Sequence, residues 1–164
     1  QTPHALHPLP PPPPDIPPPP NLITLPANTR FTYRHRLQSV QLQTTNATPG
    51  QSIGINFQWH TPRNVPWTPK LPQLAVWIHG IKQGDTQPSF YGDRYLLADL
   101  ATPSTFPDLP PYLHTITLPH DLPPGAYDLN VGLWLPNQNR TLRVRHSILP
   151  SNRRGVIVAT LNVQ

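Results

Sequence analysis

The chain contains no cysteine, no methionine and no glutamate. Without cysteine it can form neither a disulfide framework nor a zinc–thiolate site, and it has no thiol nucleophile. The lack of both sulfur-containing residues also removes the side chains that oxidise most readily, which suits a long-lived protein outside the cell. The fold must therefore be held together by packing, and we expect a secreted protein that acts in the extracellular space or at the cell surface.

Charged residues are scarce, at 12% of the chain, and no apolar run approaches the roughly 18–20 residues of a membrane span. Because the sequence starts at Gln1 rather than at methionine, we expect a mature terminus, as after removal of a signal peptide. The net charge of +5 arises from ten arginines and two lysines against seven aspartates. Since the arginines are dispersed in the sequence, we expect a solvated, mildly basic surface and no nucleic-acid partner.

Residues capable of catalysis do not form a known motif. No serine lies in a Gly-x-Ser-x-Gly elbow, and no glycine-rich phosphate loop is present. Asp85, Asp93 and Asp99 are close in sequence but lack the alternating spacing of a calcium loop, which favours roles in turns. The histidines lack metal-ligand spacing, although a site of two or three histidines assembled across strands stays an alternative. We therefore expect a protein that is not an enzyme and needs no metal or cofactor.

Proline, in contrast, is abundant, with 27 residues. A run from Pro8 to Pro20 is interrupted only by Leu9, Asp15 and Ile16. Proline fixes φ and lacks an N–H group, so this run predicts a polyproline II rod, which at about 3.1 Å per residue extends roughly 40 Å. Such a rod can be a linker or stalk, or it can lie along its own domain or a neighbouring subunit.

We expect residues 1–26 to form this extended arm and residues 27–164 to form one β-domain. Leu22-Ile23-Thr24-Leu25 has strand-like alternation and can complete an open sheet edge in its own subunit or in the next one. The residues expected to dock on a neighbouring subunit are Pro8, Pro10, Pro14, Ile16, Pro20, Leu22, Ile23 and Leu25.

The remainder of the chain has the pattern of short strands separated by turns, with no amphipathic helix. About eight strands are expected, at residues 31–44, 51–60, 74–81, 91–97, 112–118, 126–135, 141–148 and 155–163. The expected inward side chains are Tyr33, Val40, Leu42, Ile53, Ile55, Phe57, Trp59, Leu74, Val76, Ile78, Ile116, Leu118, Tyr127, Leu129, Val131, Leu133, Leu135, Leu142, Val144, Ile148, Ile157, Ala159, Leu161 and Val163. This pattern predicts an all-β fold, an antiparallel sandwich or barrel.

The stretch Leu122-Pro-Pro-Gly-Ala-Tyr-Asp-Leu-Asn-Val-Gly-Leu-Trp134 resembles the "LPPGxYxLxVGLYD" strand of the immunoglobulin-like β-sandwich domains at the C-terminus of bacterial membrane glycosyltransferases and in related exported proteins. Residues 48–59, 75–79 and 155–163 are also similar to strands of that family. The resemblance, from Arg30 to Gln164, implies an antiparallel immunoglobulin-like sandwich in which Tyr127 acts as a tyrosine corner. It covers only this β-domain and does not imply glycosyltransferase activity. Trp134-Leu135-Pro136 departs from the family's "YDP".

Three tryptophans, Trp67, Trp77 and Trp134, are candidates for an aromatic interaction surface. Trp77 and Trp134 alternate with inward positions and can form a platform for stacking sugars or docking a subunit. Alternatively, they cover the second sheet or the loop at residues 61–72. Asn46-Ala47-Thr48 and Asn139-Arg140-Thr141 match the glycosylation sequon, each in an expected turn, so Asn46 and Asn139 are candidate glycan attachment sites.

These observations favour a non-enzymatic extracellular structural protein. In this hypothesis the chain is a subunit of a filament or surface assembly, a homopolymer in which the proline-rich arm of one subunit docks on the next. The alternative is a carbohydrate-binding or accessory module of the cell envelope, suggested by the family resemblance and the tryptophans. The partner is then a glycan.

Overall fold

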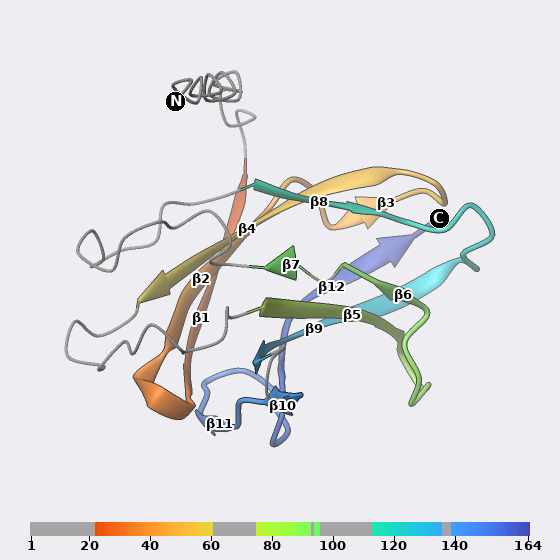
Figure 1. The fold of residues 1–164 in the computed structure, drawn as a ribbon. Coiled ribbons are helices and arrows are strands. Elements are labelled where there is room, and N and C mark those ends of the chain that lie inside the picture. The colour runs from red at the N-terminus through yellow and green to blue at the C-terminus, as the bar shows by residue number, and fades with distance from the viewer. Residues whose placement is uncertain (1–21, 61–74, 93, 96–112, 136–138) are drawn as a thin grey trace, which may run out of the picture.

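The computed structural model describes residues 22–60, 75–92, 94–95, 113–135 and 139–164. These residues form twelve strands and a three-residue 3₁₀ turn, η1 (Thr32–Arg34) (Figure 1). The strands are β1 (Ile23–Phe31), β2 (Arg36–Leu42), β3 (Asn46–Ala47), β4 (Ser52–His60), β5 (Ala75–Lys82), β6 (Phe90–Tyr91), β7 (Arg94–Tyr95), β8 (Leu113–Thr117), β9 (Gly125–Leu135), β10 (Arg140–Thr141), β11 (Val144–His146) and β12 (Val156–Val163). No helix within these ranges is long and apolar enough to cross a membrane.

The strands form two sheets. One contains five strands in the order β11-β1-β2-β4-β8, and the other contains seven, with β3-β12-β9-β5-β6 in line, β10 beside β9 and β7 beside β5. The pairings are antiparallel except that β12 runs parallel to β3, with Asn162 opposite Asn46. The all-β prediction is confirmed, whereas the expectation of a purely antiparallel arrangement fails at this pair. Several of the twelve strands are only two residues long, which is why fewer were expected.

A single hydrophobic cluster contains residues from both sheets. Strand β9 contributes Tyr127, Leu129, Val131, Leu133 and Leu135, all buried as the alternation predicts. Strand β4 contributes Ile53, Ile55, Phe57 and Trp59, also as expected. Burial of this apolar surface is the main stabilising contribution available to a chain that has no disulfide.

The opposite face of β4 is less exposed than its alternation predicts. Asn56 was expected in solvent, but it is buried, and its Nδ2 donates to Oε1 of Gln41 at 2.9 Å. Gln41 lies directly across from Asn56 on β2. This cross-strand pair satisfies the Nδ2 donor of a side chain that periodicity alone assigns to solvent, whereas Oδ1 of Asn56 is buried without a partner.

The long strand expected over residues 31–44 is wrong, because the chain turns back within it. Strand β1 ends at Phe31, η1 follows, and β2 begins at Arg36 and pairs with β1. Tyr33 and Arg34 have φ of 60° and 64°. This left-handed conformation is uncommon outside glycine and ends a strand. Tyr33 is consequently 46% exposed instead of buried, whereas Val40 and Leu42 are buried as expected.

Two expectations near the C-terminus are corrected. Ile148 was expected to face inward at the end of one strand, but β11 ends at His146 and Ile148 is 57% exposed. In β12, the pairing with β9 shifts register between Ile157 and Ala159. A bulge reverses the inward phase of a strand. Val156 and Val158 are therefore buried in place of Ile157 and Ala159, while Leu161 and Val163 are buried as expected.

Tyr127 has the geometry of a tyrosine corner. Tyr127 is fully buried. Its hydroxyl lies at the partly buried edge of the core and donates to the carbonyl of Pro123 at 2.7 Å. Burial raises the pKa of the Tyr127 hydroxyl above its ordinary value, and the negative charge of Asp85 raises this pKa further. The hydroxyl is thereby kept protonated, as its donor role requires.

Candidate functional site

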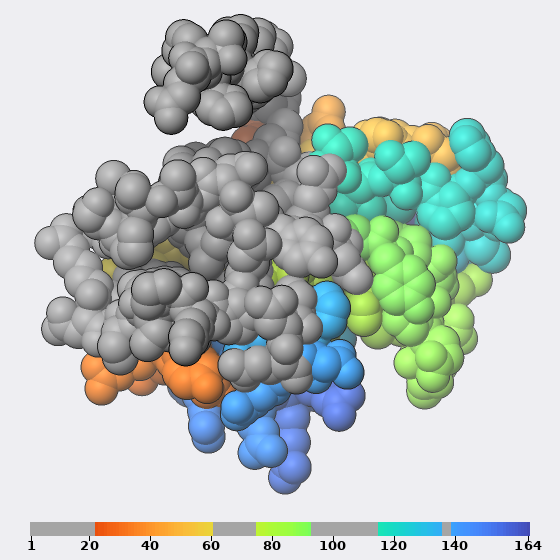
Figure 2. Space-filling view, viewed as in Figure 1, coloured from red at the N-terminus to blue at the C-terminus, as the bar shows by residue number. Residues whose placement is uncertain are grey.

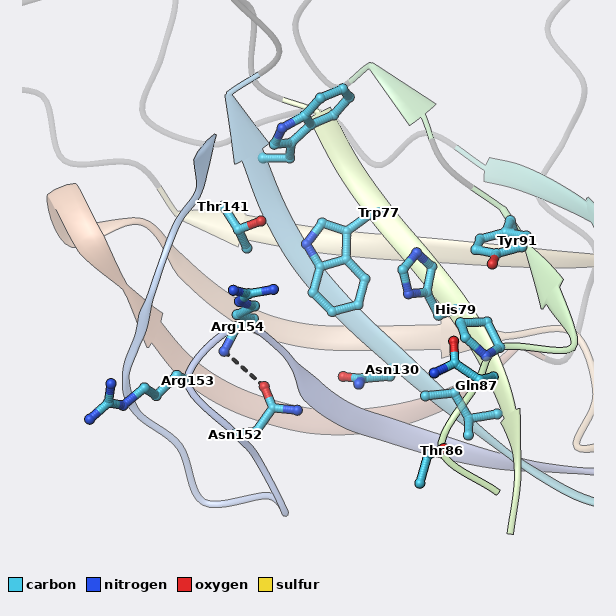
Figure 3. Close-up of a pocket in the computed structure, with 13 residues that line it drawn as sticks. Trp77, His79, Thr86, Gln87, Tyr91, Asn130, Thr141, Asn152, Arg153 and Arg154 are labelled. Atoms are coloured by element: carbon cyan, nitrogen blue, oxygen red, sulfur yellow. Dashed lines mark hydrogen bonds between the residues drawn. The ribbon is translucent and has the colours of Figure 1, made fainter. Parts of the chain in front are cut away.

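A groove of about 870 Å³ lies on the face of the seven-stranded sheet that points away from the core (Figure 3). On β5, Val76 and Ile78 point into the core. Trp77 and His79 alternate with them and therefore point to the groove. Strand β9 contributes Asn130 and Trp134 by the same alternation. The described residues that line the groove are Trp77, His79, Ile81, Thr86, Gln87, Pro88, Tyr91, Asn130, Trp134, Thr141, Asn152, Arg153 and Arg154.

Aromatic rings form a row along one side of the groove. The ring centroids of Trp77 and His79 are 4.6 Å apart, and those of His79 and Tyr91 are 4.9 Å apart in an edge-to-face arrangement. Tyr91 lies opposite His79 across the β5–β6 pair and is 61% exposed. The row thus ends in a tyrosine ring that a ligand can reach.

Trp77 is held flat by two glycines. It lies opposite Gly132 across the β5–β9 pair. A Cβ atom added at Gly132 would lie 2.2 Å from the indole ring, and one added at Gly155 would lie 2.3 Å from it. Since such approaches are sterically impossible without movement, both positions must be glycine for the indole to lie on the sheet.

The far wall of the groove is a turn that follows an asparagine. Oδ1 of Asn152 accepts hydrogen bonds from the backbone N–H groups of Arg154, at 2.8 Å, and Gly155, at 2.9 Å. This side-chain cap satisfies two backbone donors and fixes the turn. The side chains of Arg153 and Arg154 are exposed and are not needed to hold it.

Asn130 lies on the floor of the groove between these two walls, opposite His79 on one side and Ile157 on the other. Its Oδ1 atom is buried and has no hydrogen-bond partner. A Cβ atom at Gly155 would lie 2.5 Å from this Oδ1, so Gly155 also leaves space for the amide. A buried acceptor without a partner costs free energy.

The chemistry offered by the described lining residues is stacking and hydrogen bonding. They include aromatic rings, amides, two threonine hydroxyls and two guanidinium groups, but no carboxylate. Nowhere in the described ranges do three or more histidine, cysteine or acidic side chains gather as metal ligands would. A ligand with several hydroxyl groups and an apolar ring face fits such a surface.

Arginines gather at the end of the molecule next to the groove, which corrects the expectation of a dispersed basic surface. We call this region the basic end. Its members, all exposed, are Arg30, Arg34, Arg36, Arg140, Arg143, Arg145, Arg153 and Arg154. The sequence contains ten arginines in total, so pairing of distant segments has brought most of them together.

Strand register explains this gathering. Arg30 on β1 lies opposite Arg36 on β2 and opposite His146 on β11. The backbone N–H of Val144 donates to the carbonyl of Arg153 at 3.0 Å, which joins the groove's arginine turn to β11. In Figure 1, η1, β10 and β11 lie at the same end of the two sheets.

The aspartates of the described residues lie elsewhere. Oδ1 of Asp128 accepts hydrogen bonds from Gln83 and Thr160. Asp128 precedes the groove's Trp134 on β9 by roughly 20 Å, at about 3.3 Å per residue. The charge of the basic end is therefore uncompensated by these carboxylates, and an anion placed there would be attracted to it.

The other predicted site residues have mixed outcomes. Trp77 and Trp134 line the same groove, while Trp67 and the docking prolines and Ile16 of the arm lie outside the described residues. Leu22 precedes β1, and Ile23 and Leu25 lie within it, where they pair with Leu42 and Val40 of the same chain. This part of the arm region, assigned to residues 1–26, thus belongs to the five-stranded sheet.

Both glycosylation candidates are exposed. Asn139 lies in a turn with φ of 45°, as expected for its position, and Thr141 of its sequon lines the groove. Asn46 was expected in a turn but lies in β3, paired with Asn162.

Sequence reasoning missed His79, Tyr91, Asn130 and the arginine turn as parts of the site. His79 and Asn130 follow the same outward alternation as Trp77 and Trp134, so that signal was present in the sequence. The Asn152-Arg-Arg-Gly155 turn gave no such signal, because only the fold places it beside β5 and β9.

Comparison with protein-family models and with curated proteins found no match to the chain. The resemblance to the immunoglobulin-like domains of bacterial glycosyltransferases therefore stays a prediction made from the sequence.

Proposed function

We propose that this protein is a non-catalytic extracellular module that binds carbohydrate in the groove on its seven-stranded sheet. The observation that carries the proposal is the row of Trp77, His79 and Tyr91 on the outward face, where large aromatic side chains do not serve the core. Sugar rings present apolar faces that stack on such rings and hydroxyl groups that pair with amides such as Asn130.

The finer fold assignment, an immunoglobulin-like sandwich, is part of this proposal. Support comes from the adjacency of β12, β9 and β5 in one sheet, the arrangement of the G, F and C strands in such domains. The tyrosine at the start of β9, bonded to the backbone four residues upstream, supports it as well. Such domains commonly serve as binding or spacer modules outside the cell, an argument from fold alone.

A glycan array probed with the 164-residue chain tests the function. We expect binding to one group of oligosaccharides, and we expect Tyr91→Ala to weaken it about tenfold, because an exposed aromatic anchor contributes on the order of 1–2 kcal/mol. Ile23→Ala is the control, since Ile23 is an exposed large apolar side chain that does not line the groove. The proposal fails if no glycan binds, or if both variants bind as the wild type does.

A second proposal is the subunit of an extracellular filament, in which the proline-rich arm straps neighbouring subunits. The position of the arm favours it: the proline run ends at Pro20, and β1 starts at Ile23 beside β2. A docked arm would therefore be covalently continuous with β1 of the five-stranded sheet.

A further inference from the structure

We infer that the ligand of the groove is an acidic oligosaccharide, one that carries carboxylate or sulfate groups along its chain. This inference rests on the proposed carbohydrate function and specifies its substrate class. It is carried by a separate observation, the continuity between the aromatic groove and the basic end.

Arg153 and Arg154 belong to both features. They line the groove opposite Trp77, as Figure 3 shows, and they lie in the turn that is hydrogen-bonded to β11. On the same side of Trp77, Thr141 lines the groove while its neighbour Arg140 is exposed at the basic end. Figure 2 shows blue C-terminal segments beside the green segment on one face of the molecule.

Charge complementarity selects the class of ligand. Eight exposed guanidinium groups at one end repel each other, and the described carboxylates do not lie among them. Guanidinium groups pair with carboxylate and sulfate oxygens through two parallel hydrogen bonds, which a neutral sugar cannot accept with the same strength. A chain that stacks one sugar on Trp77 or Tyr91 can place its next acidic residues against these arginines.

The groove argues against charge as the sole basis of recognition. An anionic membrane or a nucleic acid would be held by the basic end alone, with no need for the aromatic row. The row lies along the sheet face at the edge of the arginine cluster, so one extended ligand can contact both. This arrangement fits a linear acidic glycan better than a flat surface.

The test uses calorimetric titration of the 164-residue chain with oligogalacturonate, alginate and hyaluronan oligosaccharides, each beside its methyl ester. The ester retains the rings and removes the charge. We expect at least one acid form to bind about tenfold or more tightly than its ester, and we expect this preference to shrink as salt is raised from about 50 to 500 mM, which shortens the Debye length. Phosphatidylglycerol vesicles and a DNA duplex are tested in the same buffer.

Three variants locate the binding. The double variant Arg153→Gln/Arg154→Gln should lower affinity for the acid form about tenfold and leave binding of the ester unchanged. Tyr91→Ala should weaken both forms. Lys82→Gln, which removes a positive charge at the opposite end of β5, is the control and should change neither. Thermal unfolding confirms that each variant is folded.

Distinct results would overturn the inference. If neutral glycans or the esters bind as tightly as the acids, the acidic specificity is wrong while the proposed carbohydrate function stands. If vesicles or DNA bind as tightly as the acid forms and Tyr91→Ala has no effect, charge alone is recognised and the inference fails. If no saccharide binds at all, both the inference and the proposed function fail.

Discussion

His35, between η1 and β2, is a buried histidine whose protonation is linked to folding. It is 5% exposed, and its burial lowers its pKa from 6.5 to about 4. Its own backbone carbonyl accepts a hydrogen bond from the N–H of Phe31 at 2.7 Å, which closes the turn that carries it. The imidazole is therefore neutral in the folded protein at neutral pH.

We predict that this histidine makes the protein less stable in mild acid. Between pH 6.5 and about 4 the unfolded chain binds a proton at His35 that the folded chain does not. The stabilisation is complete above the unfolded pKa and is lost as the pH falls, by roughly 1.4 kcal/mol per pH unit and about 3 kcal/mol in total. Denaturant unfolding of wild type and His35→Gln across this range measures the difference in slope. His146→Gln, which removes an exposed histidine, is the control, and equal slopes in both variants would contradict the prediction.

At the scale of single residues, periodicity identified most buried positions but failed where the backbone leaves the strand conformation. Val40 and Leu42 were placed correctly because β2 is regular from Ser39 to Leu42. Tyr33 was not, because its φ of 60° lies in a region that no alternation pattern encodes. Asn56 was missed since its burial depends on Gln41, a partner on another strand.

At the scale of elements, β9 is the central strand of its sheet, with β5 on one side and β12 on the other. Its inward side chains touch both sheets through the shared hydrophobic cluster. A strand paired on both edges cannot relax easily after a side chain is removed, so truncation there leaves a cavity.

We predict that Leu129→Ala lowers the free energy of unfolding by about 2–5 kcal/mol and Val131→Ala by about 1–3 kcal/mol. Both side chains are fully buried. Ile148→Ala is the matched control, because Ile148 is 57% exposed, and it should change stability by less than about 0.5 kcal/mol. Urea unfolding measures all three. An Ile148 effect as large as that of Leu129 would restore the inward assignment made from the sequence pattern.

Strands with regular alternation were more predictable than strands that contain a bulge. The strands expected at residues 51–60, 112–118 and 126–135 match β4, β8 and β9 closely, because each shows regular alternation bounded by turn residues. The segment at 155–163 was correctly identified as a strand, but half of its inward side chains were misassigned, since the bulge at Ile157 has no signature in the side chains. Gly132 and Gly155, which make room for Trp77, likewise act through contacts that only the folded chain contains.

At the scale of the whole molecule, the basic end differs most from the dispersed charge that the sequence predicted. Arginines that are spread from residue 30 to residue 154 converge because β1, β2, β10 and β11 all turn at one end (Figure 1). The net charge could be counted from the sequence, but the place where the charged side chains gather depends on the topology.

Deletion of the proline arm distinguishes the two proposed functions. Removing residues 1–20 leaves all described strands intact, so we expect the thermal midpoint to remain within about 2 °C of the full chain. Extending the deletion through Leu25 removes Ile23, Thr24 and Leu25 from their pairing with β2 and should lower the midpoint clearly. Circular dichroism on heating measures both.

The same deletions report on assembly. If the filament proposal is right, the chain that lacks residues 1–20 is folded but fails to polymerise, as seen by electron microscopy and light scattering. If polymers form as readily as in the full chain, the arm is a spacer, and the carbohydrate-binding proposal gains support.

The parallel pairing of β12 with β3 also has a consequence for biosynthesis. Among the described residues, Asn46 and Ala47 have their strand partners in Asn162 and Val163, and most of one edge of β9 stays open until residues 156–163 are made. Contacts this distant in sequence are typical of domains that fold in about milliseconds to seconds. From the synthesis of β9 until residues 156–163 are available, the nascent chain therefore carries a largely unpaired β9 edge beside an apolar face, which is the kind of intermediate that chaperones bind.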